Sequence, residues 1–129
     1  MRAVLLVVVV LLAARPAWGK VYVCDVLHVY DVENGELLSA KHETSFMHTW
    51  PKIVFDDDTG IFKYGLKGQW TEERMRIMSK GSDGWSAAGY YMHNDTIFIA
   101  IRVLASDPPS FIWMDVFQVY TGTCKVYGN

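Results

Sequence analysis

Three consecutive carboxylates, Asp56–Asp58, form the most site-like cluster in the chain, within the stretch FDDDTGIFKYG at residues 55–65. Clustered carboxylate oxygens are typical calcium ligands, and paired carboxylates can act as general acid and base. A calcium loop of the EF-hand type beginning at residue 56 would need glycine and glutamate where the chain has Ile61 and Lys67. The pattern therefore fails as a calcium loop.

The same stretch fits a hairpin turn. Asp57 suits the first position of a type I turn, and Gly60 supplies the left-handed residue that closes such a turn. We expect the carboxylates to shape a turn between two strands rather than to hold a metal ion.

The other residues that could do chemistry are scattered. Glu72 and Glu73 are adjacent in a strand pattern, so their side chains point to opposite faces. No nucleophile or nucleotide-binding motif occurs. The chain has four histidines, and their spacing does not match a zinc site: His28, His42, His48 and His93. A site assembled from distant residues stays open. We expect no catalytic residue, no metal and no cofactor. An enzymatic function is the third hypothesis, after two binding functions.

Two cysteines, Cys24 and Cys124, lie near opposite ends of the chain. In an oxidising compartment such a pair forms a disulfide. The bridge would close a loop of 100 residues, which the chain-entropy description equates with about 4 to 5 kcal/mol. No Cys-x-x-Cys motif is present, so the predicted bridge is structural.

The elements that position these residues are predicted to be strands. β-Branched and aromatic residues fill short segments separated by turn residues, among them Asn34-Gly35. Leu37–Trp50 has no clean period and is expected to be a short helix or an irregular crossover. The predicted strands are Val21–Val32, Lys52–Phe55, Ile61–Gly65, Trp70–Ser79, Trp85–His93, Thr96–Leu104 and Phe111–Tyr127. This pattern predicts an all-β fold, a small antiparallel meander or barrel-like sheet.

The last two predicted strands are apolar on both faces, whereas a half-buried strand should alternate apolar with polar residues. Three explanations stay open: the segment 37–50 covers one face, the strands line an apolar cavity, or they offer an interface. The candidate ligand-binding residues are Trp85, Tyr91, Phe98, Trp113 and Phe117.

The first residues predict export. Arg2 precedes twelve apolar residues, too few to span a bilayer, and Ala17-Trp18-Gly19 places small residues at the two positions that a signal peptidase reads. We expect a signal peptide at residues 1–19, a single β-domain at residues 20–129, and no membrane span after cleavage. An uncleaved N-terminal anchor is the alternative, because Trp18 is bulky.

The charge of the chain excludes one class of partner. Without Arg2 and Arg15, 10 basic residues remain against 14 acidic ones, a formal charge of −4. An acidic chain with no basic cluster is not expected to bind nucleic acid.

Three short motifs carry a resemblance: Tyr22-x-Cys24, FDDDTG at residues 55–60, and Thr121-Gly122-Thr123-Cys124. In these the chain loosely resembles small exported proteins of proteobacteria, mostly uncharacterised β-proteins with an early cysteine and a C-terminal TGTC. The resemblance implies a periplasmic or secreted location and a compact β-fold, and it transfers no catalytic residue.

These observations predict a non-catalytic exported β-domain that binds a small apolar or amphipathic ligand or an envelope protein partner. The alternative is an envelope interaction or inhibitor protein that uses an exposed aromatic patch. An enclosed cavity larger than about 300 Å³ would favour ligand binding, and a solid core with a surface patch would favour the alternative.

Overall fold

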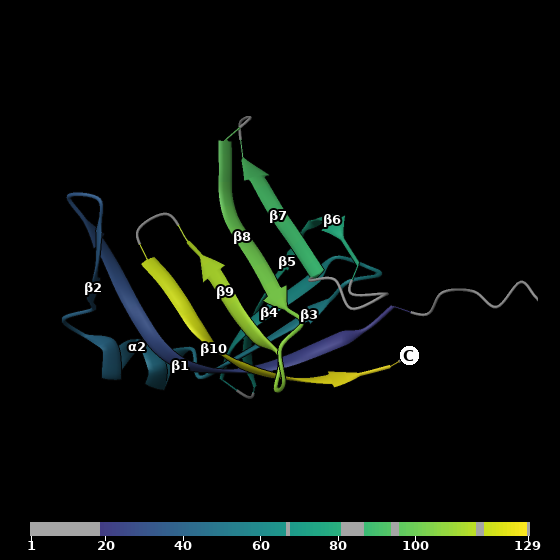
Figure 1. Cartoon of the computed structure of the whole chain (residues 1–129), viewed down its shortest axis with the longest axis horizontal. Coiled ribbons are helices and arrows are strands. Elements are labelled where there is room, and N and C mark those ends of the chain that lie inside the picture. Colours follow the sequence, from purple (N-terminus) through teal and green to yellow (C-terminus); the bar gives the residue numbers. More distant parts are fainter. Residues whose placement is uncertain (1–18, 67, 81–86, 94–95, 116–117, 129) are drawn as a thin grey trace, which may run out of the picture.

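The computed structural model describes residues 19–66, 68–80, 87–93, 96–115 and 118–128 (Figure 1). Within these residues, ten strands and one short helix follow one another, so the prediction of an all-β fold is confirmed. Their bounds are β1 Val21–Glu33, β2 Glu36–Ser39, α2 Glu43–Thr49, β3 Lys52–Asp56, β4 Ile61–Leu66, β5 Gln69–Arg74, β6 Arg76–Ser79, β7 Ala87–His93, β8 Thr96–Leu104, β9 Ser110–Met114 and β10 Gln118–Tyr127. The predicted signal peptide comprises residues 1–19. Residues 1–18 of it lie outside the described residues.

All strand pairs are antiparallel, in the order β5-β4-β3-β1-β10-β9-β8-β7-β6. The first and last strands are neighbours, because β1 pairs with β10 from Val21–Tyr127 to Asp31–Gln118. β2 also pairs with β1, beyond the part of β1 that pairs with β3. Since β10 occupies the other edge of β1, β2 and β3 share one edge, with α2 inserted between them.

The sheet curls into a nearly closed barrel with one unsealed seam. The two ends of the strand order are β5 and β6, which are consecutive in the chain and separated by Met75 alone. β5 pairs with β4, whereas β6 pairs with β7. One chain segment thus runs from one edge of the sheet to the other, and the predicted strand over residues 70–79 is a strand interrupted at the buried Met75.

Alternating residues fill the barrel, as expected for strands with one buried face. Phe62, Trp113 and Tyr120 form the centre of the core, with the rings of Trp113 and Tyr120 stacked 4.2 Å apart. Phe62 meets Trp113 edge-on at 5.3 Å. Aromatic pairs of this kind contribute roughly 0.5 to 1.5 kcal/mol each beyond the area that they bury.

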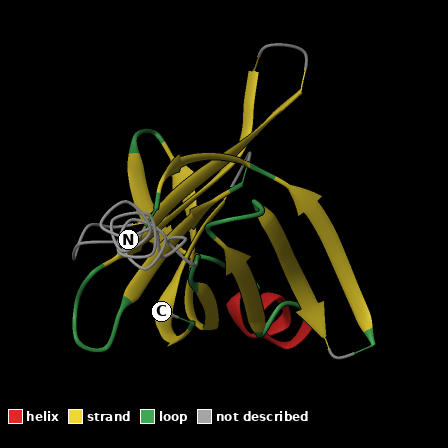
Figure 2. Ribbon diagram, turned by 90° about the vertical axis from the view of Figure 1, so that its right-hand side faces the viewer, coloured by secondary structure: helices red, strands yellow, loops and turns green. Residues whose placement is uncertain are grey.

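The helix lies beside β1 near one end of the strands (Figures 1 and 2). Phe46 and Trp50 pack onto the core, and the Trp50 ring meets Tyr64 and Tyr120 edge-on. Residues 37–50 therefore form a short strand and a helix that do not cover the outer faces of β8 and β9, where Ile112 and Met114 are exposed. Among the described residues, no helix is long and apolar enough to cross a membrane.

One predicted strand, Phe111–Tyr127, is wrong as a single element. The chain reverses within it, and the N–H of Asp115 donates to the carbonyl of Gln118 at 3.0 Å to close a tight connection between β9 and β10. Between Met114 and Gln118 the residue of a type common in turns is Asp115, with no glycine, proline or asparagine beside it. A single aspartate is a weak turn signal, and the reversal was missed from the sequence.

The predicted disulfide is confirmed. Cys24 and Cys124 lie directly opposite each other in the β1–β10 pair, and their sulfur atoms are bonded. Both side chains are buried in the core. The bridge therefore joins the first strand to the last strand inside the barrel.

Candidate functional site

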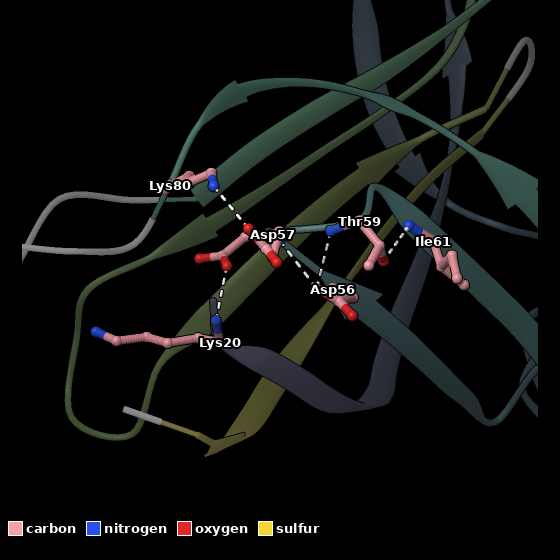
Figure 3. Close-up of polar contacts among 7 residues, drawn as sticks. Lys20, Asp56, Asp57, Thr59, Ile61 and Lys80 are labelled. Atoms are coloured by element: carbon pink, nitrogen blue, oxygen red, sulfur yellow. Dashed lines mark hydrogen bonds and ion pairs between the residues drawn. The ribbon is translucent and has the colours of Figure 1, made fainter. Parts of the chain in front are cut away.

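The acidic stretch forms the turn between β3 and β4 (Figure 3). The carboxylate of Asp56 accepts hydrogen bonds from the backbone N–H groups of Asp58 at 2.9 Å and Thr59 at 3.2 Å. Gly60 has a φ of +76° and donates its N–H to the carbonyl of Asp56 at 2.9 Å. The hairpin with Gly60 as its left-handed residue is confirmed, but Asp56 rather than Asp57 starts the turn.

Hydrogen bonding explains the titration of Asp56. Partial burial acts to raise its pKa, but the two backbone N–H groups and the nearby Lys80 outweigh it. The pKa of Asp56 is therefore below its ordinary value, because each of these contacts favours the charged form.

Asp57 has a different role from its neighbours. Its side chain is only 1 % exposed, and it accepts a hydrogen bond from the backbone nitrogen of Lys20 at 2.7 Å. The N–H of Asp57 donates in return to the carbonyl of Lys20 at 3.1 Å. Burial, together with the charge of Asp57, raises the pKa of Tyr22 to about 12. From the sequence, Asp57 is expected only as a turn residue, and its contact with Lys20 could not be foreseen.

The carboxylates of the turn point to different partners rather than to one centre. The exposed Asp58 accepts a hydrogen bond from Lys80 Nζ at 2.8 Å, while Asp56 and Asp57 bind backbone N–H groups. Across the described part of the chain, no group of three or more histidine, cysteine or acidic side chains could hold a metal ion. The arrangement stabilises a turn and fastens it to the start of β1.

The candidate ligand-binding residues do not gather at one described site. Trp113 is 1 % exposed and packed within the aromatic core, and Tyr91 is half-buried against the same core. Phe98 belongs to β8, but its side chain is outside the described part, as are Trp85 and Phe117. Of the buried side-chain polar atoms that the structure describes, Nε1 of Trp113 has no hydrogen-bond partner.

A short polar chain leads from the core towards β1. The hydroxyl of Tyr120 donates to Gln118 Oε1 at 2.8 Å, and Gln118 Nε2 donates to Asp31 at 3.2 Å. Burial, with smaller contributions from Asp115 and Asp31, raises the pKa of Tyr120 far above its ordinary value. A phenol held neutral in this way satisfies a buried hydroxyl and is not poised to release a proton near neutral pH.

A hollow of about 570 Å³, open to solvent, lies on the outer face of β6–β9. We call it the outer groove. Small residues of β7 and β8 form its floor, and larger apolar side chains of β6 and β9 form its walls. The charged side chain in its lining is that of Arg102. Its lining consists of Met78, Ser79, Ala88, Gly89, Ala100, Ile101, Arg102, Ile112 and Met114.

Strand register explains the hollow. Ala88 and Ile112 are the cross-strand neighbours of Arg102, and Ala100 lies opposite Met114. Alanine on a central strand leaves a gap between the longer side chains of the flanking strands. The gap is exposed because the alternate residues, such as Val103 and Trp113, point into the barrel.

The groove residues carry no motif that marks them in the sequence. The residues of β8 and β9 are apolar on both faces, but the aromatic side chains expected to bind a ligand face inward or lie outside the described residues. The signal for the groove in the sequence was the placement of Ala88 and Ala100 among longer apolar residues. Which longer side chains flank these alanines depends on the strand register.

Comparisons of the chain with protein-family models, with curated proteins and with solved structures found no match. The assignment of a function to the groove and the acidic turn therefore depends on their own residues and geometry.

Proposed function

We propose that this protein is a non-catalytic β-barrel that binds an amphipathic small molecule, with an apolar chain and one acidic group, in the outer groove. The observation that carries the proposal is the groove itself, about 570 Å³ with an apolar floor and Arg102 in it. The groove is open to solvent and is not the enclosed cavity expected from the sequence to favour ligand binding. Its volume lies in the range typical of pockets for small molecules, about 300 to 1,000 Å³, and such pockets combine apolar walls with a few polar groups.

The chemistry of the lining favours this class of ligand. Met78, Ile112 and Met114 are 69 %, 38 % and 50 % exposed, so a bound alkyl chain would remove their apolar surface from water. Methionine side chains adapt to ligands of irregular shape. A guanidinium binds a carboxylate, sulfate or phosphate through two parallel hydrogen bonds, which suits an acidic head group at Arg102.

The disulfide indicates an oxidising compartment of the extracellular type. Within that class, we propose that the protein is exported to the periplasm or secreted, after removal of residues 1–19. The apolar run in the first residues and the resemblance to exported proteobacterial proteins support this location.

Export makes a direct prediction. The protein recovered from the periplasm or the medium should have the intact mass of a chain that begins at Lys20 and contains one disulfide. Mass spectrometry under non-reducing conditions measures both features at once. Recovery of the full-length chain in the membrane fraction would instead support the uncleaved anchor.

Ligand binding is tested with dodecanoate and dodecanol, which share a chain length and differ in charge. Isothermal titration calorimetry should show that dodecanoate binds more tightly. Arg102→Gln should weaken dodecanoate binding about 10-fold or more, the effect expected for loss of a charge-assisted hydrogen bond, and should leave dodecanol unchanged. Ala100→Trp should weaken both, because the new ring fills the groove.

Leu38→Asp provides the matched control, since Leu38 is 44 % exposed on β2, away from the groove. It should leave the affinity for dodecanoate unchanged. Binding of dodecanoate that is insensitive to both groove substitutions, or no binding at all, would rule out the proposal.

A second candidate is an interaction protein, favoured by a separate apolar surface on the β1–β2 hairpin. Val32 and Leu37, which are cross-strand neighbours on one face of the hairpin, are 53 % and 58 % exposed there. These side chains are aliphatic rather than the aromatic residues expected from the sequence. Cross-linking to a partner that is abolished by Leu37→Asp and unaffected by Ala100→Trp would favour this candidate over the first.

A further inference from the structure

We infer that Asp57 is the internal receptor for the α-ammonium group of Lys20, which is created when residues 1–19 are removed, so that processing of the chain stabilises the folded barrel. The inference is independent of the outer groove, and it presupposes that cleavage follows Gly19.

The geometry places the two groups together. Asp57 is the one buried charged residue in the described part of the chain, and its carboxylate lies 2.7 Å from the nitrogen of Lys20 (Figure 3). The carbonyl of Lys20 accepts the N–H of Asp57 at 3.1 Å, so the two backbones are held in a fixed orientation. The nitrogen that cleavage would expose therefore already faces the buried carboxylate.

Cleavage changes the chemistry of that nitrogen. A signal peptidase adds one water across the bond between Gly19 and Lys20. The new carboxylate leaves with residues 1–19, and the new α-amino group takes up a proton at neutral pH. An uncharged amide that donates one hydrogen bond thereby becomes a cation with three donors, next to a buried anion.

An opposite charge stabilises a buried carboxylate, because removing the ion from water is costly unless charges or hydrogen bonds compensate for it. Lys80 binds Asp58 at 2.8 Å on the exposed side of the turn, and its charge also acts on Asp57. The α-ammonium would add a positive charge at the carboxylate oxygen that the nitrogen of Lys20 already contacts.

Gly19 also fits this arrangement. A β-carbon at this position would overlap with the β-carbon of Asp58. The chain just before Lys20 thus passes too close to the turn for any larger residue. The same glycine meets the requirement of a signal peptidase for a small residue at the cleavage point.

The test compares two chains that both contain the disulfide, one beginning at Lys20 and one beginning at Ala17. In the longer chain the backbone nitrogen of Lys20 remains part of a peptide bond. At pH 7 the chain beginning at Lys20 should melt about 5 to 10 °C higher. Asp57→Asn should abolish this difference between the two chains. The matched control is Asp58→Asn, which removes the same charge from the exposed side of the turn and should preserve the difference.

The pH dependence gives a second readout that needs no substitution. The ion pair raises the pKa of the α-amino group in the folded chain above its unfolded value of about 8. The added stability is therefore complete below pH 8 and is lost as the pH rises through the folded value. The other titratable groups around Asp57 are Tyr22, its neighbours Asp56 and Asp58 in the turn, and Lys80. Tyr22 and Lys80 have raised pKa values and do not titrate between pH 6 and 9.

Equal melting temperatures of the two chains at pH 7 would overturn the inference, and so would a difference that persists in Asp57→Asn or stays constant from pH 6 to pH 10. Because both chains are prepared with defined first residues, these outcomes do not depend on where the cell cleaves the protein. If mass spectrometry showed that the natural mature chain begins at another residue, the claim that natural cleavage stabilises the barrel would be overturned, whatever the melting temperatures of the two prepared chains.

Discussion

Loss of the disulfide should lower the melting temperature by about 10 to 20 °C, the largest change expected from any covalent alteration of this chain. The bridge between Cys24 and Cys124 spans 100 residues, so it restricts most of the unfolded chain. In the chain-entropy description this corresponds to about 4 to 5 kcal/mol out of a total stability of roughly 5 to 15 kcal/mol. Differential scanning calorimetry of Cys24→Ser/Cys124→Ser against the oxidised protein measures the shift.

The barrel itself should survive, because β1 and β10 remain paired from Val21–Tyr127 to Asp31–Gln118 without the bridge. Reduced wild-type protein is the sharper control, since serine places hydroxyl groups in a buried site and reduction does not. Reduced and oxidised proteins that melt at the same temperature would contradict the prediction. Two thiols that react in oxidised, denatured protein would show that the bridge is absent.

Gly60→Val should be the most destabilising single substitution in the acidic turn, by about 3 kcal/mol or more, which corresponds to a fall of 10 °C or more in the melting temperature. Two effects add. Gly60 has a φ of +76°, which a β-branched residue strongly resists, and a β-carbon there would overlap with the carbonyl oxygen of Met75. Gly60 also accepts the N–H of Met75 at 2.7 Å, so displacement would disturb the junction between β5 and β6.

Gly35→Val is the matched control for this prediction. Gly35 has a φ of +80°, and a β-carbon added to it meets no atom within 4 Å. Its substitution measures the conformational cost alone, and the excess at Gly60 measures the close approach to Met75. Asp56→Asn should cost little, because asparagine retains the oxygen that accepts the two turn hydrogen bonds. Urea unfolding of the three variants tests the order; equal costs at Gly60 and Gly35 would contradict the close-approach argument.

The sequence determined features that depend on neighbouring residues or on composition. Asn34-Gly35 and the Asp56–Gly60 stretch form the predicted hairpin turns, since left-handed backbone conformations select glycine and asparagine locally. β-Branched and aromatic residues marked the strands and therefore the all-β class. The disulfide was predicted because the apolar first residues indicate export, and two cysteines pair in an oxidising compartment.

The tertiary structure alone decided which face of each strand is buried. β8 and β9 are apolar on both faces, so periodicity could not tell that Trp113 enters the core while Ile112 and Met114 face outward. The answer depends on register with strands distant in the chain, and register is set by the whole barrel. The outer groove follows from that register and could not be predicted from aromatic content.

The same limit applies to the acidic turn. Three adjacent aspartates look equivalent in the sequence, yet Asp56 holds the turn, Asp57 is buried against Lys20, and Asp58 binds Lys80 at the surface. Local propensity predicts a turn for all three. Only the pairing of β1 with β3 brings Lys20 to this hairpin and gives Asp57 its buried partner. Contacts between residues 37 positions apart carry no local signal in the sequence.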